Sequence, residues 1–141
     1  MSLLDSNRLF PVDEKTLSIA KSLYDDICDL PIISPHGHCD PKWFAENERF
    51  PDPSQLFVVP DHYIFRMLVS QGYSLDQLGI NINKKNGCKV RSQEIWKIFS
   101  DNYYLFRATP SEMWLNYSFE KVFGLSKPLN SETSEFYFDY L

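Results

Sequence analysis

Apolar residues recur at helical spacing along most of this chain, and the spacing predicts a series of short helices. The first is expected over about residues 13–28, where apolar side chains share one face and acidic residues fill the first turn. Its apolar positions are Leu17, Ala20, Tyr24 and Ile27. A polar stretch over residues 81–89 indicates an exposed loop farther along the chain.

The later segments begin at residues that commonly cap helices, and several of them end at glycine. They are a short helix after Asp40-Pro41, a helix or strand over 54–59, and helices over 63–71, 75–78, 92–104, 110–123 and from about 130 onward. The aromatic stripes of the two longest segments are expected to be core, and they comprise Ile95, Trp96, Ile98, Phe99, Met113, Trp114, Tyr117 and Phe119.

One segment departs from the helical pattern. Ile32-Ile33, flanked by prolines, predicts a short buried strand over about residues 31–38. A strand has a side-chain period of two, so His36 and His38 would project to the same side, with Gly37 between them leaving the space open. A single strand needs a partner, and the rest of the pattern supplies none.

Paired imidazoles suggest a metal site. The nitrogens of His36 and His38 suit Zn, Mn, Fe or Ni, and a catalytic site would keep one coordination position open. The alternative is that two polar residues occupy a surface turn, because two histidines alone do not complete a metal shell. Cys39 adjoins His38 and is a further possible ligand, although a lone cysteine is more often a small buried hydrophobe.

Length and composition narrow the class of protein. The 141 residues suffice for one domain, and a net charge of -5 argues against nucleic acid as a partner. Three cysteines without CxxC spacing fit reduced thiols, and the chain shows neither a secretory signal nor an apolar run that would span a membrane. We therefore expect a soluble cytoplasmic protein. The 16% aromatic content requires either a dense core or further protein to pack against.

Three blocks in this order, residues 34–41, 60–68 and 102–110, resemble the uronate (glucuronate) isomerases of the amidohydrolase superfamily. The blocks are Ser-Pro-His-Gly-His-Cys-Asp-Pro, Pro-Asp-His-Tyr-Ile-Phe-Arg-Met-Leu and Asn-Tyr-Tyr-Leu-Phe-Arg-Ala-Thr-Pro. The resemblance implies an α/β parent fold, a (β/α)8 barrel with a metal at its C-terminal mouth. Residues 1–141 would be its N-terminal, mostly α-helical part, with the first barrel strand at about 31–38 and a helical insertion at about 41–140.

The resemblance also implies roles for particular residues. His36 and His38 would be metal ligands, most commonly for zinc, and His62 and Tyr63 would bind the sugar, with a catalytic part for Tyr63. The family interconverts D-glucuronate with D-fructuronate and D-galacturonate with D-tagaturonate. A divalent ion stabilises the enediolate-like charge of that reaction, while a phenol or imidazole steers protons. Arg66 and Arg107 are candidates for the substrate carboxylate.

The chain is shorter than the barrel that the resemblance implies. A (β/α)8 barrel takes about 250 residues, so we expect this chain alone to be inactive and to bind metal weakly. Two alternatives stay open, a metal-dependent hydrolase of the same superfamily and a non-catalytic helical domain that self-associates, since exposed aromatics and an unpaired strand favour oligomers. Without the resemblance, Asp61 and His62 would be interpreted only as the start of a helix, with Tyr63 packed beneath it.

Overall fold

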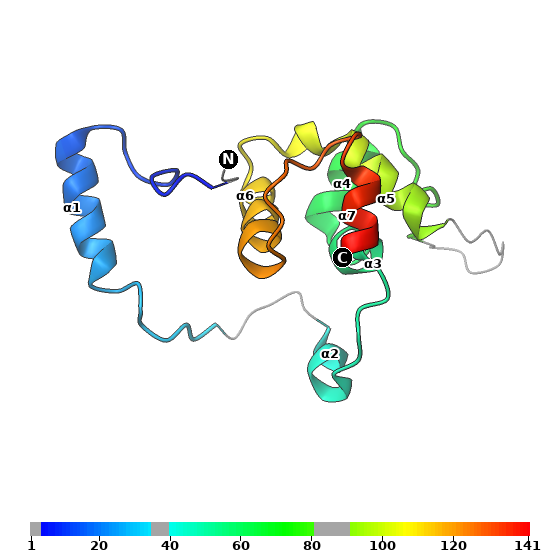
Figure 1. Cartoon of the computed structure of the whole chain (residues 1–141), viewed down its shortest axis with the longest axis horizontal. Coiled ribbons are helices and arrows are strands. Elements are labelled where there is room, and N and C mark those ends of the chain that lie inside the picture. The colour runs from blue at the N-terminus through cyan, green and yellow to red at the C-terminus, as the bar shows by residue number, and fades with distance from the viewer. Residues whose placement is uncertain (1–3, 35–39, 81–90) are drawn as a thin grey trace.

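The computed structural model describes residues 4–34, 40–80 and 91–141, and all regular elements in these ranges are helical (Figure 1). They are α1 (Glu14–Asp25), α2 (Pro41–Glu46), α3 (Pro53–Phe57), α4 (His62–Ser70), α5 (Ser92–Asp101), the 3-10 helix η1 (Tyr103–Phe106), α6 (Pro110–Tyr117), the π-helix η2 (Ser118–Val122) and α7 (Ser134–Tyr140). The prediction of a mostly helical chain is confirmed over these residues.

The core is aromatic and belongs to the later helices, α3 to α7 with η1 and η2. Trp96 lies near its centre, with ring centroids 6.5 Å from Phe57 and 5.2 Å from Phe99. The Trp96 indole N–H donates to the carbonyl of Ser134 at 3.0 Å, which ties α5 to the start of α7. The buried apolar residues are Phe57, Val58, Ile64, Leu68, Leu78, Ile95, Trp96, Phe99, Tyr103, Phe106, Leu115, Phe119, Leu125, Leu129 and Tyr137.

All of these buried residues lie at position 57 or beyond. We call residues 53–80 and 91–141 the helical unit, and residues 4–34 the N-terminal arm. Helix α1 of the arm stands apart from the helical unit and contains no buried residue (Figure 1). Within the described residues the arm therefore contributes nothing to the core, and its first residues, Leu4 to Leu9, line a cavity with the start of α6.

A polar joint fixes the helical unit where α3 and α5 begin. Asp52 caps α3 by accepting the N–H of Gln55 at 3.0 Å, and its second carboxylate oxygen accepts the hydroxyl of Ser92 at 2.8 Å. Ser54, which is fully buried, donates to the carbonyl of Ser92 at 2.6 Å. Two helix starts separated by about forty residues of sequence thus satisfy one another's polar groups.

The helix predictions are confirmed with shifted boundaries. The ambiguous segment at 54–59 is helical and begins one residue earlier, because Asp52 and Pro53 provide an N-cap and a first helical position. The helix predicted over 92–104 ends at Asp101 and continues as the 3-10 helix η1. The segment 110–123 changes from α-helix to π-helix at Ser118.

The helix predicted over 75–78 is wrong, since this segment forms one turn. The N–H of Leu78 donates to the carbonyls of Ser74 and Leu75, while Ser74 and Gln77 exchange side-chain hydrogen bonds. Gly79 then adopts a positive φ of 72°, a conformation that ends a helical turn. A single turn that ends at Gly79 in this way does not continue into a helix.

The buried strand expected over 31–38 is also not found in the residues described. Residues 31–34 have no regular structure, and Ile32 and Ile33 are 94% and 91% exposed. A strand exists only when neighbouring strands pair with its backbone groups, and no described segment pairs with this one. Residues 35–38 of the prediction lie outside the described residues.

The aromatic stripe of α6 and η2 is only partly core. Phe119 is buried, as predicted, but Trp114 and Tyr117 remain about half exposed at 50% and 49%. The corresponding prediction for α5 is confirmed more fully, because Ile95, Trp96 and Phe99 are all buried. An apolar stripe indicates which face of a helix packs, but the neighbouring elements decide how far that face is covered.

Backbone strain is localised where α6 begins. Ala108 has a φ of 62°, a left-handed value that is unfavourable for a residue with a Cβ. A capping arrangement holds it there, because the Glu112 carboxylate accepts the N–H of Ala108 at 2.7 Å while Thr109 accepts the N–H of Glu112 at 3.2 Å.

We therefore predict that Ala108→Gly stabilises the helical unit by about 1 kcal/mol, because glycine adopts positive φ without a steric penalty. The measurement is the free energy of unfolding by urea, followed by circular dichroism. Ala108→Val is the matched control and should destabilise, since a branched side chain increases the clash. A stabilising Ala108→Val would contradict the strain argument.

Candidate functional site

The start of α4 carries the predicted substrate residues, and Asp61 determines how this helix begins. The Asp61 carboxylate accepts the N–H of Tyr63 at 2.8 Å. The Asp61 carbonyl accepts the N–H groups of Ile64 and Phe65 at 3.0 and 3.1 Å. These backbone N–H groups are therefore already hydrogen-bonded. A ligand at the start of α4 would meet the side chains in preference to the backbone N–H groups.

The structure brings His62 and Tyr63 together. Their ring centroids lie 4.3 Å apart with an angle of 32° between the ring planes. His62 is half-buried and Tyr63 is 60% exposed, whereas Ile64 and Leu68 on the same helix are fully buried. The buried residues anchor α4 in the core, which leaves an imidazole and a phenol side by side at its exposed end.

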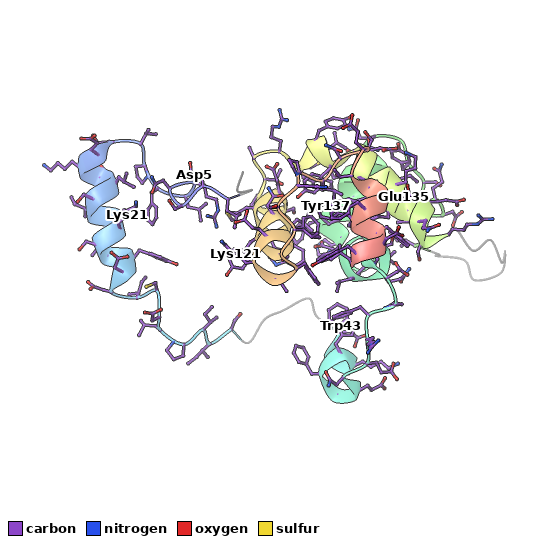
Figure 2. All side chains as sticks on the ribbon, in the orientation of Figure 1. Asp5, Lys21, Trp43, Lys121, Glu135 and Tyr137 are labelled. Atoms are coloured by element: carbon purple, nitrogen blue, oxygen red, sulfur yellow. The ribbon has the colours of Figure 1, made fainter. Side chains whose placement is uncertain are left out.

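An apolar cavity of about 250 Å³ lies beside this helix start, with Asp61 in its wall. It is lined by residues of α2, α3, α6 and η2 and of the loops next to them: Trp43, Phe50, Leu56, Phe57, Pro60, Asp61, Trp114, Ser118, Val122 and Phe123. Trp43 projects from α2 toward the helical unit and meets Phe50 edge to face at 5.0 Å (Figure 2). The sequence analysis missed this cavity, because its lining is spread over eighty residues with no local signal.

The structure does not test the predicted metal ligands. His36, His38 and Cys39 lie outside the described residues. Within residues 4–34, 40–80 and 91–141, no group of three or more His, Cys, Asp or Glu side chains is arranged to hold a metal ion. The metal prediction for His36 and His38 therefore stays a prediction.

The two candidate arginines occupy different places. Arg66 is exposed and lies one helical turn after His62 on α4. Arg107 lies after η1 and lines a polar cavity with Asp101, Tyr103 and other residues, and Asp61 is not among them. Of the two, only Arg66 shares an element with the His62 and Tyr63 pair.

The most perturbed titrating groups are structural tyrosines of the core. Burial raises the pKa of Tyr137 to about 12, and its hydroxyl donates to the carbonyl of Lys127. Burial also raises the pKa of Tyr103, whose hydroxyl donates to Asn116 at 2.9 Å. Both phenols stay protonated and hydrogen-bonded, so their role is in the packing of the core and not in proton transfer. None of the described helices is long and apolar enough to cross a membrane.

A family model described as glucuronate isomerase matches residues 9–140. The uronate isomerase of Phenylobacterium zucineum (strain HLK1) is 51% identical over 136 residues, which are 96% of this chain and 28% of that protein. The uronate isomerase of Mesorhizobium japonicum is 46% identical over 139 residues, 99% of this chain and 30% of the relative.

Solved structures agree with these relatives. The crystal structure of glucuronate isomerase from Caulobacter crescentus superposes with a TM-score of 0.90 and 48% identity, covering 99% of this chain and 29% of that one. Uronate isomerase from Thermotoga maritima gives a TM-score of 0.77 at 23% identity over 97% of this chain and supports the fold.

These matches share one class, the isomerases of uronates. The chain belongs to the glucuronate isomerase family. It spans between 28% and 30% of the length of the two curated relatives named above.

The Asp61 cap is expected to stabilise the start of α4, which carries His62 and Tyr63. Asp61→Ala removes the acceptor for the Tyr63 N–H and should lower the free energy of unfolding by about 1 kcal/mol. Asp61→Ser should retain most of the stability because serine also caps helices. Thermal melts followed by circular dichroism measure both. Asp76→Ala, at an exposed aspartate of the 75–79 turn, serves as the control, and an equal loss in it would argue against the cap.

Proposed function

We propose that this chain is the N-terminal portion of a uronate isomerase, which in the complete protein converts D-glucuronate to D-fructuronate and D-galacturonate to D-tagaturonate. The family match over residues 9–140 carries the proposal. The adjacent imidazole and phenol at the start of α4 support it, because both groups exchange protons with sugar oxygens. The same match favours the isomerase over the hydrolase alternative.

The proposed parent fold is the (β/α)8 barrel of the amidohydrolase superfamily. Residues 31–38 would be its first strand and residues 41–140 a helical insertion after it. The exposed Ile32 and Ile33 support this, because a run of consecutive apolar residues is typical of a parallel strand covered on both faces. The proposed setting is cytoplasmic, with a uronate as the small-molecule partner and a homo-oligomer as the state of the complete protein.

His36 and His38 are the proposed ligands of a divalent metal, with zinc as the proposed ion. The donor chemistry fits, since imidazole suits this ion, but two imidazoles leave the coordination shell incomplete. We propose that further ligands come from the rest of the enzyme and that this chain alone binds the ion weakly. When bound, the ion supplies Lewis-acid stabilisation of negative charge on the substrate oxygens.

The chain's own residues would bind the sugar and handle protons. In the conversion of an aldose to a ketose, a hydrogen leaves C2 and another arrives at C1, while the C1 carbonyl becomes a hydroxyl and the O2 hydroxyl becomes a carbonyl. The Tyr63 phenol would donate a hydrogen bond to the oxygen on which charge develops, and His62 would hold a neighbouring hydroxyl. The exposed Arg66 lies one turn away and would attract the carboxylate.

The test is a chimera in which this chain replaces the matched region of the Phenylobacterium zucineum relative, supplied with zinc and each uronate. We expect ketouronate formation by proton NMR, and none from the isolated chain. Tyr63→Phe should lower kcat/KM on the order of 10²-fold or more, since it removes a proton donor. Tyr104→Phe is the matched control, because Tyr104 is 61% exposed, close to Tyr63. A folded chimera that converts neither sugar would overturn the proposal.

The amount of bound zinc distinguishes the proposed metal ligands, His36 and His38, from the proposed substrate-binding residues, His62 and Tyr63. In the same chimera, His36→Ala combined with His38→Ala should abolish both activity and bound zinc, because the ion loses two ligands. His62→Ala should lower activity while zinc content, measured by atomic emission, stays that of the parent. Loss of zinc on His62→Ala alone would assign His62 to the metal instead of the sugar.

A further inference from the structure

The third sequence block, residues 102–110, takes no part in the proposed function, yet it forms one wall of a polar cavity of about 360 Å³. The cavity lies where the end of α5, the turn between η1 and α6, and residues 128–131 come together. Neither His62 nor Tyr63 lines it, so it is separate from the candidate site on α4. The charged and amide side chains that line it are Asp101, Arg107, Glu112, Asn116 and Asn130.

The two acidic side chains of the cavity already have partners. Both carboxylate oxygens of Asp101 accept from the Lys97 ammonium, at 3.3 and 3.0 Å. One oxygen of Glu112 accepts the N–H of Ala108 at 2.7 Å, which leaves its other oxygen as an acceptor. Among the described residues, no carboxylate lies within ion-pair distance of Arg107. The guanidinium of Arg107 is therefore the positive group of this cavity that remains available to an anion.

The two asparagines present hydrogen-bond donors to the cavity, because their side-chain oxygens are occupied elsewhere. The oxygen of Asn116 accepts the Tyr103 hydroxyl at 2.9 Å. The oxygen of Asn130 accepts the backbone N–H groups of Glu132 and Thr133 at 2.9 and 3.1 Å. Within the part of the chain that the structure describes, nothing accepts from either amide nitrogen. Each amide thus keeps both of its N–H donors for a ligand.

A strained backbone holds Arg107 in this position. Ala108 follows Arg107 directly and has the left-handed φ of 62°, which turns the chain between η1 and α6. The hydrogen bond from Ala108 to Glu112 keeps this conformation in place. Strained residues are retained where the surrounding structure fixes them, and they are frequent at ligand sites. Here the strain lies in the segment that brings the guanidinium to the cavity.

The available groups define the chemistry of a ligand. A guanidinium binds a carboxylate through two parallel hydrogen bonds. Amide N–H groups donate to oxygen atoms, and the second oxygen of Glu112 accepts from a hydroxyl but repels a negative charge. The ligand that fits carries a carboxylate at one end and hydroxyl groups along the rest of its length. The cavity volume lies within the range of small-molecule pockets, about 300–1,000 Å³.

We propose that this cavity is a second binding site, which takes a sugar acid, that is, a monosaccharide bearing a carboxylate. Arg107 holds the carboxylate, Asn116 and Asn130 donate to hydroxyl oxygens, and Glu112 accepts from a hydroxyl. The proposal does not rest on the proposed isomerase activity, in which none of these residues takes part. A short carboxylate satisfies only Arg107, and a neutral polyol satisfies only the amides and Glu112, so both bind more weakly than a sugar acid.

Titration of the isotope-labelled 141-residue chain with D-gluconate, followed by NMR, tests the proposal. Gluconate is a sugar acid without the carbonyl that an isomerase needs, so it does not turn over. We expect shifts in the side-chain amides of Asn116 and Asn130, and an affinity about tenfold or more above that for acetate or D-glucitol. Equal affinity for gluconate and acetate would overturn the proposal, and so would the absence of shifts in these amides.

Asn130→Asp tests the donor role without removing the structural hydrogen bonds. The aspartate keeps an oxygen for the N–H groups of Glu132 and Thr133, but it replaces the amide donors with a negatively charged acceptor. Gluconate affinity should fall about tenfold or more, while the thermal melt stays close to that of the parent. Asn47→Asp is the matched control, because Asn47 ends α2 outside this cavity and aspartate tolerates its left-handed φ. Equal losses in the two variants would contradict the proposal.

A pair of arginine variants locates the bound carboxylate. Arg107→Gln should lower gluconate affinity about tenfold or more, and Arg107→Lys should lower it less, since lysine keeps the charge but not the planar fork. Arg66→Gln removes the same charge from α4 and should leave the affinity unchanged. A loss in Arg66→Gln in place of Arg107→Gln would assign gluconate to the α4 site and overturn the proposal.

Failure of this proposal is distinguishable from failure of the proposed function. Gluconate binding that depends on Arg107, together with a folded chimera that converts neither uronate, would support the second site and overturn only the isomerase proposal. Conversion by the chimera, together with gluconate binding that is indifferent to Arg107 and Asn130, would overturn only the second site.

Discussion

The aromatic packing around Trp96 is the interaction on which the rest of the described structure depends. Trp96 on α5 packs against Phe57 of α3 and against Phe99 of its own helix, and its indole N–H donates to the carbonyl of Ser134 at the start of α7. The helices it joins have between five and ten residues and would be marginal alone. Shared burial makes them stable, and the Asp52–Ser92 joint sets how α3 meets α5.

The candidate site depends on this core through one helix. Ile64 and Leu68 are held in the core, so the exposed end of α4 is fixed in position and direction. Asp61 then occupies the first backbone donors, and the side chains of His62 and Tyr63 lie side by side at this end as the proposed substrate-binding groups. A rigid helix suits that proposed role, because the geometry of its side chains is set before a ligand arrives.

The packed unit and the arm have opposite physical characters, although both are rich in apolar residues. The unit buries its aromatics against one another, whereas the arm exposes an isoleucine pair and one face of α1. Of the two predicted ways to accommodate the aromatic content, the helical unit shows the first, a dense core. The first residues of the arm, Leu4 to Leu9, line a cavity with the start of α6, while its isoleucine pair stays exposed in the described structure.

The sequence by itself determined the features that are local. Asp40-Pro41, Asp61 and Thr109-Pro110 predict helix starts because capping involves neighbours within four residues, and three sequence blocks were enough to indicate the family. Only the tertiary structure decided that residues 75–79 form a turn, that Trp114 and Tyr117 stay half exposed, and that an apolar cavity adjoins Asp61. It also decided that residues 31–34 form no strand within the described structure, because strand pairing and burial require partners that are distant in sequence.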